Sequence, residues 1–270
     1  GYQAIKASTD NFDNTAVGYQ SLSGLSSGDM NTAVGSYTLD ANTTGSTNTA
    51  IGRGALRANT TGSLNVALGA FALAGNASGV QNVAVGNQAL EKNTATGSTA
   101  VGYQALAANT SSTGNTAVGY QALDAATTAN NTAVGYNALG TTTGADCTAV
   151  GYNALAVNTG ASNTAVGSTA LDSNTSGASN TAVGYAALTA NVSGANNTAI
   201  GYAALDAATT GNNTAVGYNA LGTTTGADST AVGYQALLVN TAGGSTAVGS
   251  RAHDANTSGA GNTAVGYIAL

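Results

Sequence analysis

Residues 131–139 read Asn-Thr-Ala-Val-Gly-Tyr-Asn-Ala-Leu, and this nonapeptide recurs with small changes along the whole chain. Its glycine returns every 16 or 17 residues, from Gly1 and Gly18 to Gly266. Self-similarity at a short fixed period is typical of proteins that stack one repeat on the next. The period therefore predicts a single continuous repeat array over residues 1–270, without a linker or a second domain.

A longer repeat is superimposed on this period. The five units whose motif glycines span residues 119–184 reappear 82 residues later, in the units that span 201–266. A duplication of five units is the simplest explanation. It indicates a fold that accepts length changes in whole units.

The residue types of one unit favour strands and turns. A unit of 16–17 residues is too short for helix-turn-helix repeats. Thr, Val and Tyr favour strands, whereas Asn-Thr-Thr-Gly at 42–45 and 59–62 is typical of turns. The chain has no Pro, as expected for strands that pair on both edges. We predict an all-β fold, a repetitive β-solenoid (parallel β-roll) of about sixteen coils, each with two short strands and two turns.

Repetition also shows which positions are constrained. Ala always stands two residues before the motif glycine, an aliphatic residue one before it, and Leu or Ile four after it, except at His253. Because side chains alternate along a strand, Thr, Val and Tyr share one face and Ala and Gly the other. One face can line the coil, and the other needs cover from another chain, so we expect an oligomer. The predicted structural ladder comprises Asn14, Ala16, Val17, Gly18, Tyr19 and Leu22, and in a later unit Ala133, Val134, Gly135, Tyr136 and Leu139.

Composition excludes several functions. Only five of the 270 residues are Lys or Arg, too few to neutralise a nucleic-acid backbone. One Cys and one His exclude disulfide frameworks and zinc fingers, and we expect no metal and no cofactor. The sequence has no run of 18 apolar residues, so we predict no membrane span in this segment. The chain begins with Gly rather than Met, which suggests a piece of a longer protein.

Few side chains are candidates for chemistry. His253 is either a surface contact, as a ligand or a pH-sensitive group, or a product of drift near the end of the array. Cys147 stands at the position of a repeated Asn and is read as its small polar substitute. Aspartates at the position after the Leu never occur in adjacent units, so they form no carboxylate pair of the kind that glycosidases need. They are Asp40, Asp124, Asp172, Asp206 and, after His253, Asp254. We therefore predict that the chain is not an enzyme.

Repeated polar and aromatic positions allow several interpretations. The tyrosines after the motif glycine either stack on sugars or on one another. The Asn series that begins with Asn14 and Asn31 is expected to exchange side-chain amide hydrogen bonds between coils. The Thr series that begins with Thr15 and Thr32 could order water, as in ice-binding proteins. Asn-x-Ser/Thr sequons, among them Asn42, Asn59 and Asn174, are left unassigned.

The Asn-x-Ala-Val/Ile-Gly core resembles the head repeats of trimeric autotransporter adhesins, and the full unit is similar to repeats of phage and prophage tail-fibre proteins. The resemblance covers essentially the whole chain. It implies a left-handed parallel β-roll, a side-by-side homotrimer, and a stiff extracellular fibre used in attachment.

We therefore expect a non-enzymatic structural rod of an extracellular fibre or adhesin, on a virion or a cell surface. Its partners would be copies of itself and, through attachment, a cell-surface receptor or glycan. A self-assembling extracellular filament and an ice-binding solenoid are the alternatives.

Overall fold

The computed structural model describes residues 1–5, 12–125, 127–208 and 210–270. The fold is an all-β parallel β-solenoid of about sixteen turns, which confirms the predicted fold class. No helix long and apolar enough to cross a membrane occurs in these ranges. The structure separates into two compact units, Gly1–Ala133 (unit 1) and Val134–Leu270 (unit 2). The single array over 1–270 stays a prediction.

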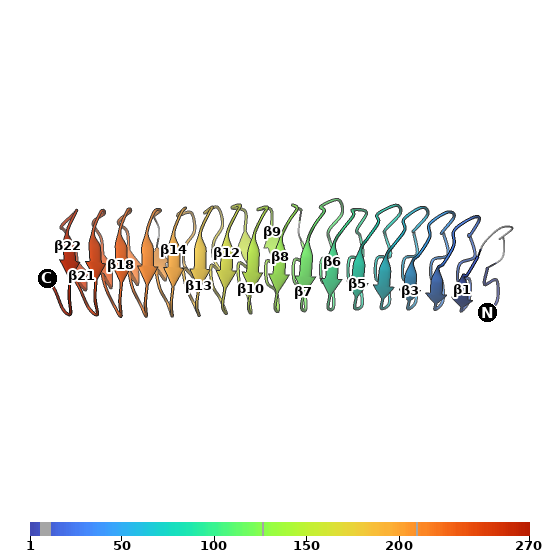
Figure 1. Cartoon of the computed structure of the whole chain (residues 1–270), viewed down its shortest axis with the longest axis horizontal. Coiled ribbons are helices and arrows are strands. Elements are labelled where there is room, and N and C mark those ends of the chain that lie inside the picture. The colour runs from blue at the N-terminus through green and yellow to red at the C-terminus, as the bar shows by residue number, and fades with distance from the viewer. Residues whose placement is uncertain (6–11, 126, 209) are drawn as a thin grey trace. The chain divides into compact units, whose positions relative to one another are not determined.

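Each coil contributes one three-residue strand to a parallel sheet (Figure 1). Neighbouring strands pair in register, residue type on residue type, as in Ala16 with Ala33 and Val17 with Val34. In unit 1 the strands are β1 (Thr15–Val17), β2 (Thr32–Val34), β3 (Thr49–Ile51), β4 (Val66–Leu68), β5 (Val83–Val85), β6 (Thr99–Val101) and β7 (Thr116–Val118). The boundary between the units falls within β8 (Thr132–Val134).

Unit 2 repeats the arrangement. Its main strands are β10 (Thr148–Val150), β12 (Thr164–Val166), β13 (Thr181–Val183), β14 (Thr198–Ile200), β16 (Thr214–Val216), β18 (Thr230–Val232), β20 (Thr246–Val248) and β22 (Thr263–Val265). It also holds short second strands, which pair in two small parallel sheets. These are β9 (Thr141–Thr142), β11 (Val157–Asn158), β15 (Ala207–Ala208), β17 (Thr223–Thr224), β19 (Val239–Asn240) and β21 (Ala255–Asn256).

The remaining described coils, including those of unit 1, have one strand each, so the expectation of two strands in every coil is wrong for them. After the motif glycine the chain curls, because the residues two and four positions later take left-handed backbone angles. Gln20 has φ 53° and Leu22 has φ 52°, and the same pair of positions repeats along the chain. The backbone still bonds from coil to coil: Gln20 N donates to Tyr2 O at 3.0 Å and Leu22 N to Thr38 O at 3.0 Å. Coil-to-coil hydrogen bonding therefore continues through a segment that is not extended.

The core of each unit is narrow and is filled by two repeated columns. Between the terminal coils, the strand Ala and the Leu of the curl are fully buried, as at Ala50 and Leu56. The motif glycines let successive backbones come close: at Gly201, with φ 133°, an added Cβ would lie 2.5 Å from the Gly217 carbonyl oxygen. The core thus excludes any side chain at this glycine.

Candidate functional site

An Asn ladder runs beside the sheet, one residue before each strand; we call it the first Asn column. Asn31 Nδ2 donates to Asn14 Oδ1 at 3.1 Å and to Gly45 O at 2.9 Å. The backbone N–H of Asn31 donates to the same Asn14 oxygen at 2.9 Å. The exchange repeats at Asn48, Asn65 and Asn82, which are all fully buried. Each side chain thus satisfies both its own amide and a backbone donor.

A second Asn column, seven residues after the motif glycine, was not identified from the sequence. Asn59 Nδ2 donates to Asn42 Oδ1 at 2.9 Å and to Gly62 O at 2.9 Å. Gly62 O also accepts from Asn48 Nδ2 of the first column, at 2.9 Å, so one carbonyl joins the two columns. Asn recurs at this spacing in the sequence, but Asn followed by Thr and Gly is equally typical of an exposed turn.

Three asparagines of glycosylation sequons lie in the second Asn column. Asn42, Asn59 and Asn174 have no exposed side-chain surface. Their amide nitrogens donate to buried backbone carbonyl oxygens, those of Gly45, Gly62 and Gly177. These three side chains are therefore not accessible to a glycan in the folded chain.

Coils of different length differ only in the arc between the two columns. In a 17-residue coil the arc runs from Asn42 to Asn48, and in a 16-residue coil it runs from Asn93 to Ser98. Strand register is kept in both cases, as in the pairing of Thr32 with Thr49 and of Val83 with Thr99. The extra residue is absorbed at the turn.

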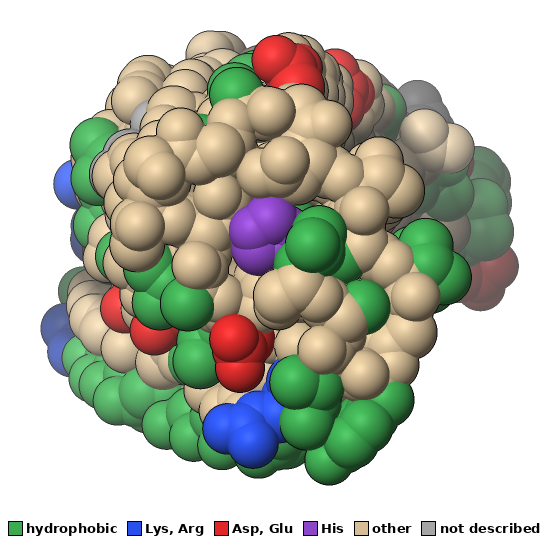
Figure 2. Space-filling view, turned by 90° about the vertical axis from the view of Figure 1, so that its left-hand side faces the viewer, with side chains coloured by type: hydrophobic (Ala, Val, Ile, Leu, Met, Phe, Trp, Pro, Cys, Tyr) green, Lys and Arg blue, Asp and Glu red, His purple; other side chains and the backbone are tan. Residues whose placement is uncertain are grey.

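The last residue of each three-residue strand forms an aliphatic column that points away from the core. Val17 is 56 % exposed, and in unit 2 the side chains from Val150 to Ile200 at this position are 37–42 % exposed. We call this column the Val face. Ala16, Ala133, Leu22 and Leu139 point the other way; Ala133 and the two leucines are fully buried, and Ala16, in the first strand, is half-buried. Hydrophobic side chains gather along one side of unit 2 when it is seen from its C-terminal coil (Figure 2).

Tyrosines border the Val face and stack on one another. Tyr19 stacks on Tyr2, with ring centroids 5.7 Å apart, and meets Tyr37 edge to face. Tyr136 stacks on Tyr152 at 5.3 Å. A ring with stacked neighbours on both sides, such as Tyr202, has no free face for a sugar. The geometry thus favours mutual stacking over a sugar platform.

The motif glycines Gly18 and Gly135, which precede Tyr19 and Tyr136, have φ values of 136° and 138°.

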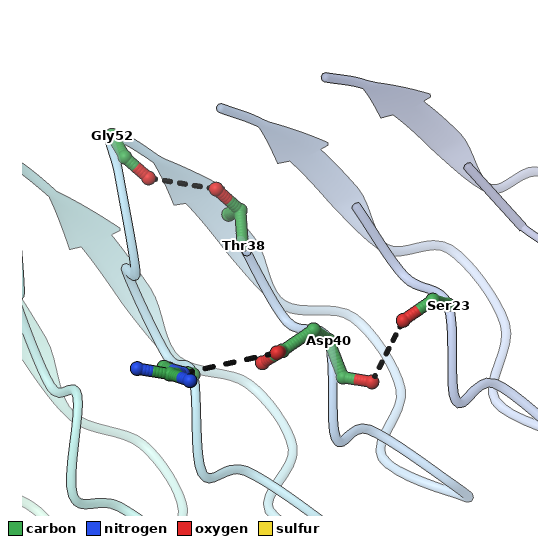
Figure 3. A network of polar contacts seen from close by, with 5 residues as sticks. Ser23, Thr38, Asp40 and Gly52 are labelled. Atoms are coloured by element: carbon green, nitrogen blue, oxygen red, sulfur yellow. Dashed lines mark hydrogen bonds and ion pairs between the residues drawn. The ribbon is translucent and has the colours of Figure 1, made fainter. Parts of the chain in front are cut away.

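The aspartates that follow the core Leu are half-buried. Asp40 Oδ2 forms an ion pair with Arg57 Nε of the next coil, at 3.8 Å (Figure 3). The backbone carbonyl oxygen of Asp40 accepts a hydrogen bond from Ser23 Oγ at 3.4 Å. Desolvation by burial raises the pKa of Asp40, and the nearby Arg57 opposes this rise. Burial likewise raises the pKa of Asp124, Asp172 and Asp206. These carboxylates are tolerated singly, in agreement with their spacing in the sequence.

We predict that Asp172→Asn stabilises the chain at pH 7 and leaves its stability unchanged at pH 3. Burial raises the pKa of Asp172 above 3.8 in the folded chain, and no partner offsets it. The stability linked to its protonation is complete below 3.8 and is lost as the pH rises through the folded pKa. The thermal midpoint at pH 7 should rise because the burial penalty is removed. The rise should be only about 1–2 °C, because the carboxylate is partly solvated. Circular dichroism at both pH values measures it.

Asp40→Asn is the matched control for Asp172→Asn. It also removes a desolvated charge, but it breaks the contact with Arg57. We expect a smaller gain at pH 7. Equal midpoints for Asp172→Asn and the unaltered chain at pH 7 would contradict the burial penalty.

His253 takes the place of a core Leu. Its backbone N–H donates to Ala269 O at 2.7 Å, and its Nδ1 is buried without a hydrogen-bond partner. The imidazole, the only one in the chain, is visible in Figure 2 on the C-terminal face of unit 2. Arg251 and Asp254 form an ion pair of 3.9 Å beside it in sequence. A role for His253 as a surface contact stays a prediction.

Cys147 occupies a rung of the first Asn column. Asn158 Nδ2 lies 3.3 Å from its Sγ, which in turn lies 3.4 Å from Gly160 O. Burial raises the pKa of the thiol and keeps it protonated at neutral pH. The side chain thus behaves as a small polar member of the ladder.

The described residues hold neither a pocket nor a group of three His, Cys, Asp or Glu side chains placed to bind a metal. The candidate site is therefore a surface, the Val face with its bordering tyrosines. Comparisons with protein-family models, curated proteins and solved structures found no match for this chain.

Proposed function

We propose that the chain is a non-enzymatic structural segment of an extracellular attachment fibre or adhesin, in which three copies pack side by side through their Val faces. The observation that carries the proposal is the Val face itself: an in-register aliphatic column on the outside of a sheet whose other side is already packed. Contiguous exposed apolar surface of this kind marks an interaction site. The repeat's resemblance to adhesin heads and phage tail fibres supports the attachment role and the number three.

A second copy of the chain is the partner that fits this face best. The Val side chains recur once per coil, at about 4.8 Å, the spacing of neighbouring strands. A copy of the same chain presents the same spacing, so aliphatic side chains can interlock along many coils. A partner without stacked strands lacks this spacing and would lose register after a few coils. The low charge density, 16 charged residues in 270, leaves little to repel a second copy.

Light scattering of the purified chain tests the proposal. We expect three times the chain mass of 25.7 kDa. The triple variant Val150→Lys, Val166→Lys and Val183→Lys should dissociate to the single-chain mass, because three adjacent charges would be buried at the interface.

A matched variant controls for added charge. It places lysines at Thr143, Thr159 and Thr175, which are exposed and lie outside the Val face. This variant should keep the mass of the unaltered chain. A monodisperse single chain without any substitution would overturn the trimer. Long fibres would favour the filament instead, and thermal hysteresis would favour ice binding.

A further inference from the structure

Four tyrosines of unit 2 stack on consecutive coils and form what we call the Tyr run: Tyr185, Tyr202, Tyr218 and Tyr234. Successive ring centroids lie 5.2, 5.0 and 5.3 Å apart, with planes inclined by 16°, 7° and 14°. The rings are 43–54 % exposed. The parallel register of the strands that precede them holds each ring beside the next.

We propose that the Tyr run is a site of oxidative coupling, where a one-electron oxidant of the peroxidase class joins neighbouring tyrosines as dityrosine. Each of two phenols gives up one electron and one proton. The two phenoxyl radicals form one carbon–carbon bond between ring carbons ortho to the oxygens. The hydrogens on these carbons then move to the oxygens, which restores both phenols. Hydrogen peroxide takes up the two electrons and two protons and becomes two waters.

The geometry favours coupling between neighbours over other fates of the radical. Holding two reacting groups side by side replaces a collision between molecules with a step inside one molecule. The half-exposed rings have room to turn about their side-chain bonds until the ortho carbons meet. The product is a covalent link between two successive coils, in addition to their hydrogen bonds.

The composition directs oxidation to the tyrosines. The chain has no Trp, so no indole competes for the oxidant. Its one thiol, Cys147, is 1 % exposed. Its one thioether, Met30, lies in unit 1. Within unit 2 the phenols are therefore the accessible oxidisable side chains.

The chain contains its own internal control. Ser168 takes the position of a tyrosine in the coil between Tyr152 and Tyr185. A missing ring leaves about 10 Å between these tyrosines, two strand spacings, which is too far for a carbon–carbon bond. Tyr267 tests exposure alone, because it is the most exposed tyrosine of unit 2, at 75 %. Coupling controlled by stacking should spare both places.

The experiment treats the dilute purified chain with a haem peroxidase and hydrogen peroxide, then denatures it and cleaves before aspartate. Cleavage before Asp172, Asp206, Asp228 and Asp254 places Tyr218 on peptide 206–227 and Tyr234 on peptide 228–253. Mass spectrometry should find these two peptides joined with the loss of two hydrogens. Peptide 172–205, which holds Tyr185 and Tyr202, should join 206–227 or lose two hydrogens internally. Dityrosine fluorescence should appear while the chain keeps its single-chain mass on a denaturing gel.

The double variant Tyr202→Phe and Tyr218→Phe gives the decisive comparison. Phenylalanine keeps the stacked rings but cannot form a phenoxyl radical, so the cross-linked peptides of the Tyr run should disappear. Joined peptides that place Tyr152 on Tyr185, or that involve mainly Tyr267, would overturn the proposal. So would oxidised tyrosines without dityrosine, or dityrosine found only between chains.

Discussion

Gly201→Ala is expected to unfold the coils around β14 and β16, with a loss of about 4 kcal/mol of local stability from backbone strain and overpacking. The added Cβ would lie 2.5 Å from the Gly217 carbonyl oxygen, and Gly201 has φ 133°, which side chains rarely allow. Hydrogen exchange of the Gly217 amide, which donates to Ile200 O at 2.8 Å, reports the local opening. The thermal midpoint by circular dichroism reports the whole chain.

Gly244→Ala is the matched control for this prediction. Gly244 also lies in unit 2 and has φ 73°, but an added Cβ would find its nearest neighbour, the Gly261 nitrogen, at 3.7 Å. Only the cost of a left-handed alanine remains, about 1 kcal/mol. If both variants melted together, the close approach of successive motif glycines would not be what restricts this position.

Asn48→Ala is expected to cost about 3 kcal/mol, because it leaves buried polar groups without partners. Asn48 Oδ1 accepts from both the backbone N–H and the Nδ2 of Asn65, at 3.0 and 3.1 Å. Its Nδ2 donates to Asn31 Oδ1 and to Gly62 O. Removal of the side chain therefore breaks bonds on both neighbouring coils. Thermal melting and hydrogen exchange of the Asn65 amide measure the effect.

Two variants define the cause of this loss. Asn48→Ser should lose less, since at the equivalent rung Ser98 Oγ donates to Ser112 O at 3.5 Å, as Asn48 Nδ2 donates to Gly62 O. Asn196→Gly removes an exposed Asn with φ 59° that bonds only at the surface, so it should change little. Equal losses in Asn48→Ala and Asn196→Gly would argue against the buried ladder.

The parallel stacking and the Ala and Leu columns could be predicted because every coil carries the same residue at the same place. A ladder of identical residues pairs in register only when successive strands are parallel and one coil apart, and Ala33 pairing with Ala50 is an instance. The recurrence of Leu four residues after the motif glycine marked this position as constrained. Repetition within one sequence thus served as an internal comparison.

The conformation of the Leu column could not be predicted in this way. Leu56 has φ 50°, a left-handed angle that costs about 1–2 kcal/mol for a residue with a Cβ. Full burial of its side chain and the bond from Leu56 N to Ala72 O at 3.0 Å offset this cost. Both contributions come from neighbouring coils, so local propensity gives no sign of them. The Leu column therefore lies in a curl and not in a strand, also in the coils where a short second strand follows, such as β9 after Leu139.

The second Asn column was missed for a related reason. Asn followed by Thr and Gly is common in solvated turns, and local chemistry alone does not distinguish an exposed Asn from one that bonds the next coil. Only stacking places Asn59 against Asn42. The proposed partner of the Val face is a different case, because its identity depends on a surface that belongs to another molecule.

The arc between the two Asn columns makes the fold a scaffold for peptide display. Thr43, Thr44 and Thr47 in one such arc are exposed, and coils already differ there by one residue without loss of register. Short foreign sequences inserted into arcs of one unit would leave both Asn columns and the strand in place, as exposed loop tips usually allow. Insertion into every third arc would space the displayed epitopes at intervals of about 14 Å, set by the strand spacing.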